Sequence, residues 1–104
     1  MHTVNEVIQA VNAYAESAAQ FPSDREYFKF VGKFAGRLNT SPEAQAARQI
    51  REAALEVLIA IQEWPVLERP ANGDRILQAP DGSTVLYYCE HRSNGQTFER
   101  LCQR

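Results

Sequence analysis

The residues best suited to chemistry are two cysteines and a histidine near the end of the chain. Cys89 and His91 are two residues apart, and Cys102 follows them. Thiolate and imidazole are zinc ligands, and a Cys–His pair is also a common nucleophilic arrangement. A structural zinc site needs a fourth ligand, which the surrounding sequence does not offer, and a nucleophilic pair needs a third group to orient the histidine. We therefore expect two buried thiols in a reducing compartment, with no metal and no cofactor.

The geometry of this group depends on the turn between the two strands that carry it. A two-residue type I′ loop at Asn94-Gly95 places Cys89 opposite Arg100, and Cys89 then meets Cys102 only diagonally. A type II′ loop at Gly95-Gln96 instead places Cys89 opposite Cys102. Asn-Gly is the stronger hairpin signal, so we expect the first register and no disulfide.

Other signals of catalysis or membrane insertion are missing from the sequence. It contains no phosphate-binding glycine loop, HExxH or GxSxG motif, so we expect no enzymatic activity. Eleven Lys and Arg face thirteen Asp and Glu, and this net charge of -2 provides no general attraction to nucleic acid or anionic lipid. The N-terminus lacks the pattern of a signal peptide, and the apolar run 57–61 is too short to span a bilayer. We expect a cytoplasmic protein without a membrane segment.

A series of basic residues recurs every four positions in the predicted second helix. Its members are Arg25, Lys29, Lys33 and Arg37. Such a series is suited to contact with phosphates or an acidic partner. The simpler interpretation, which we favour, is a solvated face or pairing with Glu52, Glu56 and Glu63 of the next helix.

The elements that carry these residues follow from capping signals and periodicity. The first helix is predicted from about Val4 to Gln20 behind a Thr3 capping box, and the second from Ser23 to about Leu38. The third is a long helix at 41–64, which begins with Ser-Pro. Turn signals then separate three strands at 75–78, 83–92 and 97–104, and the first of these turns is a type I turn at Pro80-Asp81 with left-handed Gly82. The prediction is an α+β fold in which three helices, the third long, pack on a small three-stranded antiparallel β-meander. We expect one domain over residues 1–104, with a helical part at 3–64 and a β-meander part at 74–104.

More apolar surface is predicted than such a fold can cover. Leu55 and Ile59 add a second apolar strip to the long helix, beyond the strip that faces the core. Tyr87 and Tyr88 are adjacent in a strand and point to opposite faces of the sheet, so helices on one face can cover only one of them. These four residues are therefore a candidate partner or dimer interface.

The sequence thus favours a small cytoplasmic protein–protein interaction module, an adaptor, inhibitor or assembly factor, that forms a homodimer and binds another protein without catalysing a reaction. One alternative is a nucleic-acid-binding regulator, because three helices before a hairpin is the order of a winged helix; its contact would be the basic series. The acidic third helix argues against that alternative. Another alternative is a small metal- or Cys/His-dependent protein.

Overall fold

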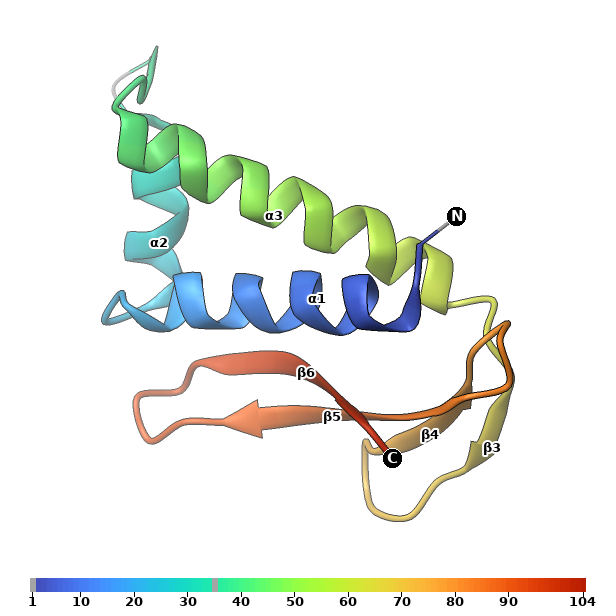
Figure 1. Ribbon diagram of the computed structural model, residues 1–104. Coiled ribbons are helices and arrows are strands. Elements are labelled where there is room, and N and C mark those ends of the chain that lie inside the picture. The colour runs from blue at the N-terminus through green and yellow to red at the C-terminus, as the bar shows by residue number, and fades with distance from the viewer. Residues whose placement is uncertain (1, 35) are drawn as a thin grey trace.

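The computed structural model describes residues 2–34 and 36–104 and has an α+β architecture. Its three helices are α1 (Val4–Ala19), α2 (Asp24–Val31) and α3 (Pro42–Ile61). Its strands are β1 (Lys33–Phe34), β2 (Arg37–Leu38), β3 (Val66–Glu68), β4 (Arg75–Gln78), β5 (Thr84–His91) and β6 (Thr97–Gln103). β1 and β2 form a separate two-stranded hairpin, and the other strands form one antiparallel sheet in the order β3-β4-β5-β6 (Figure 1). Three helices and an antiparallel sheet are therefore confirmed.

The prediction of three strands is wrong, because the sheet has four. The additional strand, β3, lies directly after the end of α3 and pairs antiparallel with β4, with Val66 opposite Leu77. All three of its residues are exposed, so it has no alternation of buried and exposed side chains that would reveal a strand in the sequence. Prolines at 65 and 70 on either side also favour a turn interpretation.

The ends of α1 and α3 follow the predicted signals closely. The Thr3 hydroxyl accepts a hydrogen bond from the Glu6 backbone N–H at 3.2 Å, and the Ser41 hydroxyl accepts one from the Ala44 N–H at the same distance. Each bond satisfies one of the free amides of a first helical turn. At the other end, α3 stops at Ile61 rather than at Trp64.

α2 ends at Val31, well before the predicted Leu38, for two reasons. A Cβ atom at position 32 would lie 2.8 Å from the Phe28 carbonyl oxygen, so the chain leaves the helix at a glycine that permits this close approach. The last carbonyls of the helix are also satisfied by tertiary contacts: Asn39 Nδ2 donates to Phe30 O at 2.8 Å, and Arg48 Nη1 donates to Val31 O at 3.1 Å. The chain beyond Gly32 is thus free to form the β1–β2 hairpin.

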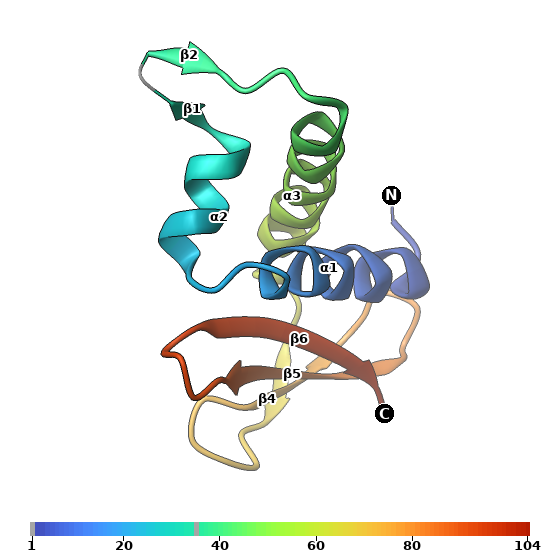
Figure 2. The ribbon, with the colours of Figure 1, turned by 90° about the vertical axis from the view of Figure 1, so that its left-hand side faces the viewer.

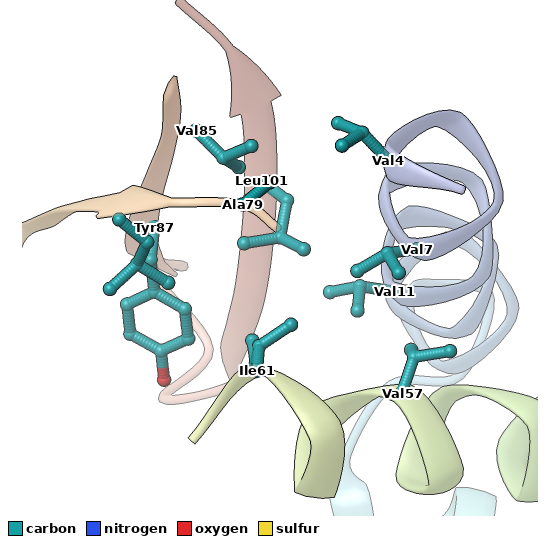
Figure 3. Close-up of a cluster of buried hydrophobic side chains, with 10 residues drawn as sticks. Val4, Val7, Val11, Val57, Ile61, Ala79, Val85, Tyr87 and Leu101 are labelled. Carbon is teal, nitrogen blue, oxygen red and sulfur yellow. The ribbon is translucent and has the colours of Figure 1, made fainter. Parts of the chain in front are cut away.

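α1 lies between α3 and the sheet and forms the centre of the core (Figures 1 and 2). Figure 3 shows side chains of α1, α3 and the sheet meeting there, including Val7, Val11, Val57, Val85 and Leu101. Burial of a Val or Leu side chain contributes roughly 1.5–3 kcal/mol, so this cluster joins the helices to the sheet. A second cluster around the fully buried Tyr27 joins α1, α2, α3 and the start of β6.

α1 also closes one edge of the sheet through Asn12. Its Nδ2 donates to the Leu101 carbonyl at 2.9 Å, and its Oδ1 accepts from the Leu101 N–H at 3.2 Å. Arg100 adds an ion pair to Glu16 of α1, at 2.7 Å. The backbone of β6 thus has partners on its outer side, whereas β3, at the other edge of the sheet, is exposed.

Candidate docking cleft

The structure separates the two cysteines, and the prediction that both thiols are buried is wrong, because Cys89 is half-buried and Cys102 is exposed. Cys89 lies opposite Glu99, and Cys102 lies opposite Leu86. Both predicted registers are therefore wrong, because the loop has three residues, 93–95, and is closed by a 2.9 Å hydrogen bond from the Arg92 N–H to the Gln96 carbonyl. A change of register by one residue moves a side chain to the other face of the sheet, so Cys89 and Cys102 lie on opposite faces.

The longer loop has a local cause. Asn94 Oδ1 accepts a hydrogen bond from the Gln96 N–H at 3.0 Å, so this side chain mimics a backbone turn and does not sit in a type I′ loop. Gly95 supplies the positive φ, 88°, that ends a three-residue loop. A turn forms at Pro80-Asp81 as predicted, with a 2.9 Å hydrogen bond from the Gly82 N–H to the Ala79 carbonyl, Gly82 at a φ of 92° and Leu77 opposite Val85.

In this arrangement Cys89, His91 and Cys102 do not come together at one site. His91 Nδ1 lies 3.3 Å from the Thr97 hydroxyl, and the Cys102 thiol, on the other face, donates to the Gln103 carbonyl at 3.5 Å. Within residues 2–34 and 36–104, no three His, Cys, Asp or Glu side chains gather in a way that could hold a metal ion.

The surroundings of Tyr87 shift the pKa of its phenol strongly. Burial, followed by the nearby Glu99 carboxylate and the Cys89 thiol, raises the pKa of Tyr87 to about 12, and the Arg75 guanidinium opposes this shift. The Arg75 guanidinium lies over the Tyr87 ring at 4.4 Å. Tyr87 is therefore a neutral, packed phenol near pH 7 and not a base.

The basic series does not lie on one helix, so that part of its prediction is wrong. Arg25 and Lys29 are exposed on α2, whereas Lys33 belongs to β1 and the exposed Arg37 to β2. The side chain of Lys33 lies outside the described part of the structure. Lys29 and Arg37 line an open hollow of about 840 Å³ together with Phe30 and other residues of α2 and β2.

The exposed apolar side chains gather in another place. Among the side chains that the structure describes, the large exposed ones are Phe28, Leu38, Leu55, Ile59, Val66 and Leu67. Phe28, Leu55, Ile59 and Val66 come from three different elements, yet all line two neighbouring hollows of about 270 and 450 Å³. These hollows share Leu55, Leu58 and Glu99, and we call them together the docking cleft.

The docking cleft has α3 as one wall and the sheet as its floor, and side chains of α1 also line its smaller hollow. The smaller hollow reaches α2 and the start of β6, where Tyr27, Phe28 and Phe98 line it. The larger hollow extends to β3 and β4, where Val66 and Leu77 line it. Figures 1 and 2 show α1 between α3 and the sheet, where it lies along β6.

The predicted interface residues divide between two surfaces. Leu55 is 37% exposed, Ile59 is 68% exposed, and both line the docking cleft. Tyr87 forms part of the floor and is only 9% exposed; Figure 3 shows its ring beside Ile61. Tyr88 is half-buried on the opposite face of the sheet and does not line the cleft.

Sequence reasoning missed two wall residues, Phe28 and Val66. Phe28 directly follows Tyr27 on α2, and neighbours on a helix point about 100° apart. Since Tyr27 is 1% exposed, Phe28 turns toward solvent at 47%. That angular separation was available from the sequence, whereas no pattern marked Val66.

Acidic groups surround the docking cleft. Asp24 and Glu99 line it directly. The exposed Glu52 precedes Leu55 by three residues on α3 and so lies beside that exposed side chain, whereas the Glu56 carboxylate lies 3.3 Å from His2, which lines a different hollow.

The nearby cations are placed differently. The Arg75 guanidinium stacks on Tyr87, and the Arg51 guanidinium lies 5.4 Å from the centre of the Phe28 ring. Both cations are held against aromatic faces and keep their charge, but the carboxylates of Asp24, Glu52 and Glu99 outnumber them around the opening.

Comparison of the chain with protein-family models, curated proteins and solved structures finds no match. Among the described residues, no helix combines the length and the apolar character needed to cross a membrane.

Proposed function

We propose that this chain is a protein–protein interaction module that binds a segment of another protein in the docking cleft. The observation that carries the proposal is the convergence of Phe28, Leu55, Ile59 and Val66, from three elements, on one opening. Contiguous exposed apolar surface with a polar rim is typical of binding sites. Covering one such side chain contributes about 1.5–3 kcal/mol, so a partner that covers several gains substantial affinity.

The surroundings of the cleft support binding rather than catalysis. Its floor presents Tyr87, whose pKa of about 12 keeps the phenol neutral, so it neither donates nor accepts protons readily near pH 7. An adaptor, inhibitor or assembly factor needs only such a surface. Free thiols on opposite sheet faces suit a reducing compartment, and we propose that the protein acts in the cytoplasm.

Site-specific photocrosslinking in cells tests this proposal. A photoreactive amino acid at Ile59, inside the docking cleft, is expected to crosslink to a discrete protein. The matched control is Leu38, which is also exposed, at 51%, but lies outside the cleft. Ile59→Glu is expected to abolish capture by a crosslinker at Leu55, whereas Leu38→Glu leaves it intact, with circular dichroism confirming that both variants fold.

Two results would contradict the proposal. Equal crosslinking from Ile59 and Leu38 would mean that the cleft is not selective. A crosslinked product with the mass of two copies, and no other product, would make the cleft a homodimer interface instead, which native mass spectrometry of the bare chain would show independently.

A further inference from the structure

We infer that the occupant of the docking cleft is an amphipathic helix of a partner protein, with an apolar stripe flanked by Lys and Arg. This inference rests on the proposed function and adds the conformation and charge of the ligand. It follows from three features of the described residues: the walls of the cleft, the type of groups on its floor, and the charges at its rim.

The walls repeat an arrangement that the fold already uses for a helix. α1 packs against α3 on one side and against β6 on the other, as Figures 1 and 2 show. The docking cleft offers the same two walls, α3 and the sheet. Leu55, Leu58, Ile59 and Gln62 line it at the helical spacing that forms a ridge for another helix. From Leu55 to Gln62 the wall is about 10 Å long at 1.5 Å per residue, which suits a ligand helix of two to three turns.

The floor argues against an extended ligand. It is the face of a sheet, so it presents side chains such as Leu77 and Tyr87, while the backbone groups of the strands point along the sheet. An extended peptide there would lose water from its own N–H and C=O groups without gaining strand partners. A helix satisfies its backbone internally and brings only side chains to the cleft.

The rim decides the charge of the ligand. Asp24 and Glu99 line the opening, Glu52 lies beside it on α3, and the Glu56 carboxylate is turned toward His2, which lines a different hollow. Arg51 and Arg75 lie against aromatic rings and keep their positive charge. Glu56 has His2 as a neighbour at 3.3 Å, and the other three carboxylates have no ion pair within the described part of the chain. Lys or Arg on both flanks of an apolar stripe would complement this rim.

The same charges disfavour a second copy of the chain. If a second copy covered Leu55 and Ile59, the acidic rim of each copy, with Asp24 and Glu99, would face the same acidic rim of the other. Like charges brought close at an interface oppose association. A basic-flanked helix of a different protein has no such penalty.

Two synthetic stapled helices provide the test. Both carry the same leucine stripe at i, i+3, i+4 and i+7; one has lysine on its flanks and the other has glutamate. We expect the lysine helix to bind at least about tenfold more tightly in isothermal titration calorimetry, since its contacts with several rim carboxylates add to the repulsion that these carboxylates exert on the glutamate helix. The preference should shrink as salt is raised. In NMR spectra, amide shifts should concentrate at Leu55, Ile59 and Tyr87.

A charge-matched pair of variants isolates the rim. Glu52→Gln/Glu99→Gln raises the net charge by two and should reduce the preference for the lysine helix. Gln9→Lys/Gln103→Lys raises the net charge by the same amount at exposed positions that do not line the cleft, and should leave the preference close to wild type. Equal loss in both variants would overturn the rim assignment, because only long-range charge would then matter.

The outcomes separate this inference from the proposed function. Binding of neither helix, or binding of both equally, overturns the inference; if Ile59 still crosslinks to a discrete partner in cells, the proposed function stands. Loss of crosslinking as well removes both. Shifts confined to residues outside the docking cleft also overturn the inference, because the helix would then bind elsewhere.

Discussion

Replacement of Asn12 by alanine should uncouple α1 from the edge of the sheet. The Asn12 amide makes both a donor and an acceptor contact with Leu101, at 2.9 and 3.2 Å. Asn12→Ala removes both and leaves the Leu101 N–H and C=O facing the surface of α1. The Leu101 side chain is only 2% exposed, and both hydrogen bonds are partly buried, so water replaces them incompletely.

The expected cost can be worked out from these contacts. Two hydrogen bonds contribute about 1 kcal/mol each, and backbone groups left partly unsatisfied add about 1 kcal/mol more. Alanine is the better helix former, which returns roughly 0.5 kcal/mol. Asn12→Ala should therefore lower the free energy of unfolding by about 2.5 kcal/mol.

Urea unfolding, followed by far-ultraviolet circular dichroism and by Trp64 fluorescence, measures this cost. Gln9→Ala is the matched control, since Gln9 is exposed on the same helix. If Asn12→Ala differs from Gln9→Ala by less than about 0.5 kcal/mol, the edge contact does not stabilise the fold and the reasoning is wrong. Coincident transitions by the two probes would also support our expectation that residues 1–104 unfold as one domain.

Three further perturbations test other parts of the structure. The Arg92 guanidinium is hydrogen-bonded to Glu90 and lowers the pKa of that carboxyl. The stabilisation that this ion pair gives the fold is complete above the usual glutamate range and is lost as pH falls through the lowered pKa. Arg92→Ala should therefore flatten the acid limb of a curve of stability against pH. Burial raises the pKa of Tyr87 from 10.0 to about 12, so the neutral phenol stabilises the fold fully below pH 10.0, and this stabilisation is lost as pH rises toward 12. Tyr87→Phe should remove the phenol that titrates last from the ultraviolet absorbance curve. An unchanged curve would contradict the assigned surroundings of Tyr87. Gly32→Ala should cost about 1–3 kcal/mol in thermal unfolding, because the new Cβ would lie 2.8 Å from the Phe28 carbonyl oxygen; a neutral effect would mean that the end of α2 shifts freely.

Local signals accounted for much of the fold. Capping residues such as Thr3 and Ser41 placed the starts of helices correctly, because each cap interacts only with the next turn of chain. The turn before Gly82 was also correct for the same reason, since its residues bond within the loop. Where the deciding contacts came from distant residues, prediction failed: the carbonyls at the end of α2 bond to Asn39 and Arg48, and neither partner is visible in the sequence of that helix.

The register of the last hairpin shows how a local signal can mislead. Asn94-Gly95 is the usual type I′ pair, yet the Asn94 side chain bonds to Gln96 and reaches Pro22 O, at 3.2 Å, in the loop after α1. This tertiary contact helps to hold a three-residue loop. One added loop residue then moved Cys102 to the face opposite Cys89. The chemistry that the sequence suggested for these thiols thus depended on a single residue of loop length.

The sequence predicted the α3 side of the docking cleft but not the side chains that meet it from α2 and β3. Helical periodicity alone showed that α3 carries more apolar surface than one neighbour covers, and Leu55 and Ile59 are indeed exposed. Periodicity describes one element at a time, however, so it could not show that Phe28 and Val66 come from either side to meet this strip. An isolated exposed leucine needs no explanation, whereas apolar side chains from three elements around one opening support the proposed binding site. The convergence, rather than the exposure of any one residue, is therefore the property that mutations at Ile59 and Glu99 should test.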